Sequence, residues 1–291
     1  MRPLTLCYRV ALDALYRFNA DDGWAIASHI ALSALMSLFP FLILVTALGG
    51  LLFGSTQLAD EVADILLGIW PTEVASPIAD EIRRVLLGAR SDLLTLGVAL
   101  AIYFASSGIE SLRIGLNRAY GVFEHRSWWL LRLESIGYVL IAALGLLALS
   151  FGIVLAPLII ATAVRHAPLL EPLWSLFNFL RISVAAIVLI VALVIVHKWL
   201  PAGRRQFITV LPGIAVTLVL WLVAGELFGD YLARFAYTYV SYYAGLASAM
   251  IALVFLYVIA SIFILGGELN AAILRWRDAQ EPAKVTEAAE S

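Results

Sequence analysis

The chain has 291 residues, of which 63% are hydrophobic and 14% charged, and its mean hydropathy is +0.95. Because soluble domains are near half apolar and a quarter charged, this composition excludes a water-soluble globular protein. The formal net charge of -2 provides no basic excess for binding nucleic acid phosphates. A single cysteine, Cys7, can form neither an internal disulfide nor a paired-thiol metal or redox site.

Residues 1–20 have an amphipathic pattern ahead of the first long apolar run. Their apolar positions share one helical face and are Leu4, Tyr8, Leu12 and Leu15. This pattern is typical of a helix that lies in the headgroup plane of a membrane, so we expect an N-terminal interfacial helix.

Six later segments are long enough to cross a bilayer, which requires roughly 20 mostly apolar residues in a helix. The predicted spans are about 24–53, 93–109, 135–164, 174–200, 206–226 and 243–272. We therefore expect an all-α polytopic membrane protein in which residues 1–275 form one six-helix domain.

The segments outside the spans have distinct patterns. Apolar stripes within residues 54–92 predict short amphipathic helices in the outer loop between spans 1 and 2. Residues 276–291 are polar and are expected to form a disordered cytoplasmic tail. Lys and Arg in alternate loops number 13 on the side of both termini and 6 on the other side. The positive-inside rule then places both termini in the cytoplasm.

Groups for hydrolysis or ATP binding are missing from the sequence pattern. Hydrolysis of a phosphodiester calls for clustered metal ligands or a positioned acid and base, whereas the four histidines are dispersed along the chain. The Gly-x-x-x-x-Gly-Lys-Ser/Thr loop that holds nucleotide phosphates is also absent. We therefore expect no enzyme activity, no catalytic, cofactor-binding or metal-ligating residue, no cofactor, and no ATP-driven pumping by this chain alone.

Polar side chains at membrane depth are the most informative residues. They recur on shared faces of the first, fifth and sixth predicted spans and could line one polar pathway. The candidates are His29, Ser33, Ser37, Thr209, Thr217, Tyr257, Ser261 and Glu268. Small and hydroxyl residues also allow helices to approach and to hydrogen-bond across their interface, and a lone histidine is often a satisfied buried group. Both interpretations remain open.

Glu268 follows 33 residues, 235–267, that contain no charged side chain. An acid at such a position is costly, so it normally pairs with a cation or faces water. Arg113, Arg118 and Arg204 are the expected partners of a structural ion pair. The alternative is a role in proton or cation coupling, or in substrate binding.

A polar motif follows the second predicted span. Ile109, Leu112, Leu116 and Tyr120 form an apolar stripe, which predicts that the helix continues along the inner surface. The motif comprises Glu110, Arg113, Asn117 and Arg118. It could bind a headgroup or a helix end, or it could be a positive-inside anchor.

Four stretches of the chain carry a family resemblance. They are SLFP (37–40), SSGIESLRIGLNRAYGV (106–122), LPGIAVTLVLW (211–221) and YAGLASAMIALVFLYVIASIFILGGELNA (243–271). Together they resemble the YihY/BrkB family of bacterial inner-membrane proteins, through Asn117, Arg118, Gly121 and the terminal Gly-Glu-Leu-Asn. The resemblance implies six membrane helices in the bacterial inner membrane. The family has carried a virulence-factor label and an older ribonuclease label, and some members are associated with export, including export of lipid-linked material.

The function we expect is transport or export of a small or amphipathic solute, lipid-linked solutes included. The expected partners are membrane lipids and an unidentified solute or lipid substrate, with no nucleic acid. A homo-oligomer or an envelope partner protein remains open. The alternatives are a non-transporting scaffold in envelope assembly and, disfavoured by the residues, a membrane-associated ribonuclease.

Overall fold

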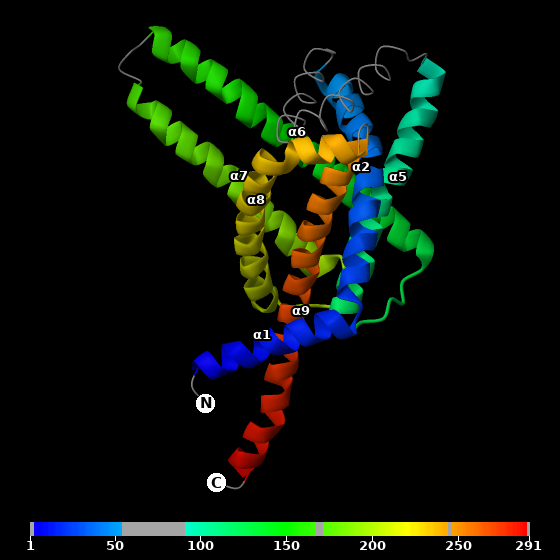
Figure 1. Cartoon of the computed structure of the whole chain (residues 1–291), viewed down its shortest axis with the longest axis vertical. Coiled ribbons are helices and arrows are strands. Elements are labelled where there is room, and N and C mark those ends of the chain that lie inside the picture. Colours follow the sequence, from blue (N-terminus) through cyan, green and yellow to red (C-terminus); the bar gives the residue numbers. More distant parts are fainter. Residues whose placement is uncertain (1–2, 54–90, 167–170, 244–245, 290–291) are drawn as a thin grey trace. The chain divides into compact units, whose positions relative to one another are not determined.

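The computed structural model describes residues 3–53, 91–166, 171–243 and 246–289, in which the elements are all α-helices (Figure 1). The helices are α1 (Pro3–Ala20), α2 (Gly23–Phe53), α5 (Ser91–Ala119), α6 (Trp128–His166), α7 (Glu171–Trp199), α8 (Phe207–Tyr243) and α9 (Ala247–Ala289). The predicted all-α class is confirmed for these residues. The helices predicted in the outer loop lie outside them.

Five of these helices are long and apolar enough to cross a membrane. The candidate spans are Gly23–Val45, Trp128–Leu149, Ile182–Trp199, Phe207–Phe235 and Ala247–Ala279. The predicted second span lies in α5 but is not among them. Its apolar stretch, 93–109, is short for a span and is followed in the same helix by Glu110, Arg113 and Arg118. The chain is thus a multi-pass membrane protein by its helices, while six spans and cytoplasmic termini remain predictions.

Two helices extend beyond the boundaries that the sequence predicts. The predicted fifth span ends at residue 226, but α8 continues to Tyr243, because charged side chains at a four-residue spacing do not interrupt a helix. Similarly, α9 continues to Ala289, through most of the tail that the sequence predicts to be disordered. Residues 276–289 extend a helix that is already formed, so they do not bear the cost of nucleating a new one.

The chain divides into two compact units. Unit 1 comprises Met1–Leu35, Glu110–Ser127 and Ala192–Ser291, and unit 2 comprises Met36–Ile109 and Trp128–Val191. In unit 2, Leu44 of α2, Ala105 of α5 and Val139 of α6 pack into one buried cluster. Parts of these three helices therefore share an apolar core.

In unit 1, α8 packs closely against α9. Gly213 of α8 lies so near α9 that an added Cβ would overlap the Gly266 carbonyl oxygen and the Asn270 side chain. A Cβ at Gly266 would likewise overlap the hydroxyl of Thr217. Small residues at both positions allow this approach, as in many membrane helix pairs.

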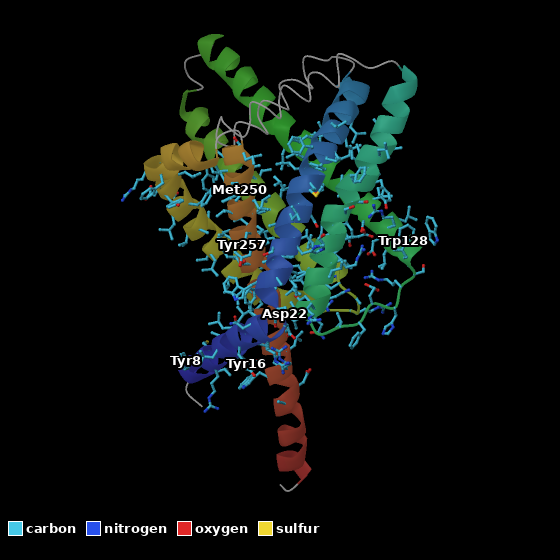
Figure 2. The ribbon with its side chains drawn as sticks, turned by 45° about the vertical axis from the view of Figure 1, so that its right-hand side comes forward. Tyr8, Tyr16, Asp22, Trp128, Met250 and Tyr257 are labelled. Carbon is cyan, nitrogen blue, oxygen red and sulfur yellow. The ribbon has the colours of Figure 1, made fainter. Side chains whose placement is uncertain are left out.

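Helix α1 contacts α9 through one face and leaves an apolar face exposed. Val10 and Ala14 of α1 pack against Ala272 of α9. The exposed apolar side chains of α1 are Tyr8, Leu12, Leu15 and Tyr16, and the two tyrosines point away from the helix in Figure 2. The predicted N-terminal helix is confirmed, and its exposed apolar face is typical of a helix in the headgroup plane.

Candidate functional site

The C-terminus of α5 is closed by a glycine turn. The amide of Val122 donates to the carbonyl of Asn117 at 2.9 Å, and the amide of Gly121 donates to the carbonyl of Arg118 at 2.9 Å. Gly121 has a φ of 63°, the left-handed conformation that such a helix end requires. The continuation of this helix past residue 109 is confirmed, and the turn explains the glycine of the Asn-Arg-x-Tyr-Gly pattern.

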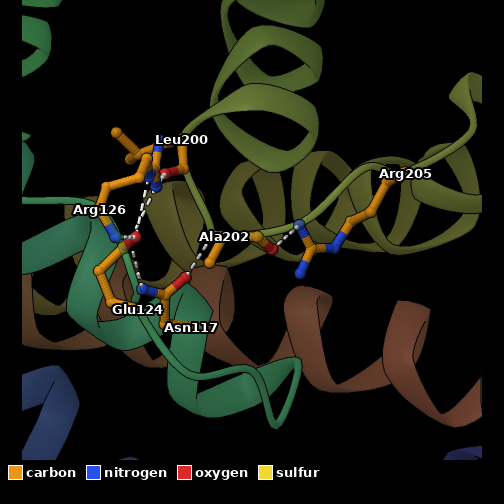
Figure 3. A network of polar contacts seen from close by, with 6 residues as sticks. All are labelled: Asn117, Glu124, Arg126, Leu200, Ala202 and Arg205. Atoms are coloured by element: carbon orange, nitrogen blue, oxygen red, sulfur yellow. Dashed lines mark hydrogen bonds and ion pairs between the residues drawn. The ribbon is translucent and has the colours of Figure 1, made fainter.

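The side chain of Asn117 joins two loops (Figure 3). Its Nδ2 donates to Glu124 Oε2 at 3.2 Å, and its Oδ1 accepts from the Ala202 amide at 2.7 Å. Glu124 lies in the loop between α5 and α6, and Ala202 lies in the loop between α7 and α8. One amide therefore fixes the connection between α7 and α8 against the end of α5.

Arg126 completes this contact through Glu124. Its Nε and Nη2 donate to the two carboxylate oxygens of Glu124, each at 2.8 Å, and Nη2 also donates to the Leu200 carbonyl at 3.1 Å. The side-chain hydrogen bonds from Arg126 lower the pKa of Glu124 from 4.5 to about 2. Glu124 is therefore charged at neutral pH, and the pair holds both loops.

This ion pair predicts a dependence of stability on acid. Because the folded pKa is depressed, the contribution of Glu124 is full above pH 4.5 and is lost as the pH falls toward about 2. As the pH is lowered from about 5 to about 3, the unfolding temperature of the detergent-solubilised protein should fall less steeply in the Glu124→Gln variant than in wild type. Equal slopes for wild type and variant would contradict the pairing, whereas Asp230→Asn, which removes an exposed carboxylate elsewhere, should keep the wild-type slope.

Arg205 connects the same loop to Tyr120. Its Nη1 donates to the Ala202 carbonyl at 3.0 Å, and its guanidinium lies 3.9 Å from the ring centroid of Tyr120. Burial raises the pKa of Tyr120 to about 12, so the phenol stays neutral beneath the cation. We call the set Asn117, Tyr120, Glu124, Arg126, Ala202 and Arg205 the polar junction.

Asn270 of α9 extends the polar junction into the helix pair α8 and α9. Its Nδ2 lies 3.3 Å from the Tyr120 hydroxyl and 3.0 Å from the Val210 carbonyl, while its Oδ1 accepts from the Gly213 amide at 2.7 Å. These backbone groups of α8 flank Pro212, which has no N–H and disrupts the local helical bonding. The fully buried amide therefore satisfies backbone groups of α8 at its proline.

Glu268 lies on a different face of α9 from the one that meets α8. It is two residues from Gly266, which corresponds to a rotation of about 200° around the helix axis. Its side chain is 1% exposed, and Oε2 has no hydrogen-bond partner among the described residues. The charges that act on it are Arg17 and Arg275, which are favourable, and Asp13 and Asp21, which are unfavourable. Glu268 thus lies near charges of both signs from α1, the turn after it and α9.

Glu268 forms no ion pair with its expected partners among the described residues. Arg118 pairs with Asp22 at 3.4 Å on the surface, and none of the ion pairs between described residues includes Glu268. Arg204 is exposed in the loop before α8. The structure therefore gives no support for a structural ion pair with Arg113, Arg118 or Arg204.

The candidate pathway residues differ in their contacts and in their exposure. Thr209 and Ser261 donate to carbonyls of their own segments, Gln206 at 2.7 Å and Tyr257 at 2.8 Å. His29 is exposed, and its Nε2 lies 3.4 Å from the Ser111 hydroxyl. Ser33, Ser37 and Tyr257 are half-buried, and the Tyr257 ring lies beside that of Trp24. Thr217 is buried against Gly266. Ser37 belongs to unit 2 and the others to unit 1. A shared pathway stays a prediction.

In the predicted cytoplasmic motif, Arg113 and Asn117 are buried, Glu110 is half-buried and Arg118 is exposed. Asn117 has the contacts described above, so it binds a loop rather than a helix end.

Sequence reasoning missed Glu124, Arg126, Arg205 and Asn270 as site residues. For Asn270 a signal was present, because it ends the Gly-Glu-Leu-Asn pattern. Among the residues that the structure describes, no group of three or more His, Cys, Asp and Glu could hold a metal ion.

Comparison with known proteins places these residues in a family. A family model described as virulence factor BrkB matches residues 14–290, which include the polar junction, Glu268 and Asn270. The chain belongs to this family. The resemblance found in four stretches is thereby confirmed.

One relative in this comparison is YfkH of Bacillus subtilis (strain 168), a protein named only as ribonuclease-like. It is 28% identical over 261 residues, which cover 88% of this chain and 92% of that protein. No solved structure matches the chain. Family membership thus rests on sequence similarity along most of the chain.

Proposed function

We propose that this BrkB-family chain is a bacterial inner-membrane transporter that exports a small or amphipathic solute, lipid-linked solutes included. Export would draw on an ion gradient, the solute gradient or a partner protein, and the chain would not act as an enzyme. Both termini would lie in the cytoplasm. The multi-pass helices support a membrane function, and the observation that carries the proposal is the environment of Glu268.

Glu268 is an uncompensated acid inside the candidate span Ala247–Ala279. It is 1% exposed, and its Oε2 has no hydrogen-bond partner among the described residues. A charged side chain inside a membrane helix is costly and is usually retained for function. An acid without a dedicated cation is suited to exchange a proton or a cation, or to bind a polar group of the solute.

A groove begins one helical turn beyond Glu268 along α9. It has a volume of about 340 Å³ and lies between α1 and α9, with Arg17, Ala272 and Arg275 in its wall. Ala272 is four residues from Glu268, which is one helical turn. Glu268 itself is not in the lining, but the wall holds the two arginines whose charges act on this acid.

Glu268→Gln tests the proposal because it keeps the size of the side chain and removes its charge. If Glu268 couples transport, the variant should accumulate normally, unfold within about 1 kcal/mol of wild type and fail to export. If Glu268 were half of a structural pair, the stability loss would be about 3–5 kcal/mol. Protein abundance, the unfolding temperature and the pools of exported lipids and solutes separate these outcomes.

Glu226→Gln is the matched control, because Glu226 is an exposed acid in the candidate span of α8. It should retain both folding and export. A Glu268→Gln variant that exports as wild type would contradict the proposed role and would favour the scaffold alternative. The name of YfkH suggests ribonuclease activity, but no geometry among the described residues supports that activity here, so we do not propose it.

A further inference from the structure

A second groove lies beside the polar junction. It has a volume of about 430 Å³ and is formed by the loop between α7 and α8 together with Arg126. Its charged lining residues are Arg126, Lys198, Arg204 and Arg205, and no carboxylate lines it. We call it the basic groove.

Three of the four cations of the basic groove, Lys198, Arg204 and Arg205, take part in no ion pair between described residues. Glu124 compensates Arg126, but Arg205 contacts only the Ala202 carbonyl and the Tyr120 ring in the described part of the chain. Lys198 lies over the ring of Trp199, 4.6 Å from its centroid. Burial lowers the pKa of Arg205, which reflects the cost of holding this charge away from water. An anion in the groove would offset that cost.

The position of the basic groove relative to the ends of the candidate spans indicates what kind of anion it can bind. It lies between the end of the candidate span Ile182–Trp199 and the start of the candidate span Phe207–Phe235. Trp199 and Phe207 are 52% and 49% exposed. Aromatic side chains are typical of the boundary between the hydrocarbon and the headgroups, so the groove opens at the level of lipid phosphates.

We propose that the basic groove binds the phosphate-bearing headgroup of an anionic membrane lipid. Arginine presents a planar pair of donors that matches a phosphate, and Lys198 adds a point charge. Basic pockets at membrane helix ends are suited to such headgroups. The inference does not depend on export, because a scaffold could bind the same lipid.

The test is binding of phosphatidylglycerol to the purified full-length chain in detergent, measured by native mass spectrometry. Loss of one cation near a headgroup should lower the affinity about fivefold, so Arg204→Gln and Lys198→Gln should each weaken binding by about that factor. Arg204→Lys keeps the charge and should retain most of the affinity. Phosphatidylcholine, which has a phosphate but no net charge, should bind at least about fivefold more weakly than phosphatidylglycerol.

Arg277→Gln is the matched control, because Arg277 is an exposed arginine of α9 that does not line the basic groove. It should leave lipid binding unchanged. Equal losses in Arg204→Gln and Arg277→Gln, or no loss in Arg204→Gln and Lys198→Gln, would overturn the proposal. Inorganic phosphate that displaces phosphatidylglycerol at equal concentration would identify a soluble phosphate as the ligand and would also overturn it. Lys198→Gln provides the answer if Arg204→Gln fails to fold.

Discussion

Replacing Gly213 by alanine is expected to lower the unfolding temperature of the detergent-solubilised protein by roughly 6–12 °C, which corresponds to about 3 kcal/mol. The added Cβ would overlap the Gly266 carbonyl oxygen and the Asn270 side chain. The first of these is backbone, so α8 and α9 would have to separate. That separation would also break the hydrogen bond between the Gly213 amide and Asn270.

Gly225→Ala is the matched control on the same helix. A Cβ at Gly225 would meet no atom within 4 Å. Alanine in a helix interior is favoured over glycine by about 0.5–1 kcal/mol, so this variant should be as stable as wild type or more stable. Similar unfolding temperatures for Gly213→Ala and Gly225→Ala would contradict the close approach of α8 and α9.

Asn270→Ala is expected to cost about 1–3 kcal/mol, because it removes a buried amide that makes hydrogen bonds to two backbone groups of α8, each worth about 0.5–1.5 kcal/mol. These groups are the Gly213 amide and the Val210 carbonyl. The loss should appear as a lower unfolding temperature and as less protein in the membrane. Both effects follow from the loss of a side chain of α9 that is hydrogen-bonded to the backbone of α8.

Ser261→Ala provides the comparison on α9. The Ser261 hydroxyl donates to the Tyr257 carbonyl of its own helix at 2.8 Å, so its removal leaves no group unsatisfied. The expected change is below about 0.5 kcal/mol. If Asn270→Ala were as mild as Ser261→Ala, the amide would not support α8 as described.

Much of the fold could be predicted from long apolar runs and from amphipathic patterns in the sequence. The first predicted span, 24–53, coincides with α2 except at one residue, and the amphipathic pattern of residues 1–20 corresponds to α1. These predictions succeed because burial in lipid requires long uninterrupted apolar runs. Helix ends are less predictable, since a charge such as Glu226 ends an apolar run without ending the helix.

The polar contacts were harder to predict because they join residues far apart in sequence. Asn117 reaches Ala202, and Asn270 reaches Gly213, through hydrogen bonds that no local pattern encodes. The sequence indicated the importance of Asn117 and of the Gly-Glu-Leu-Asn segment, but it did not indicate their partners. For Glu268, the sequence left open an arginine partner and a role in coupling or substrate binding, and the structure shows a buried side chain whose Oε2 has no hydrogen-bond partner among the described residues.

Proposed export is tested most directly by comparing the lipids and small solutes that cells retain and release with and without this chain. Cells that lack it should retain one class of compound that wild-type cells release. The wild-type chain should restore release, and Glu268→Gln, present at the same level, should not. Identical retained and released pools in all three strains would contradict a transport function.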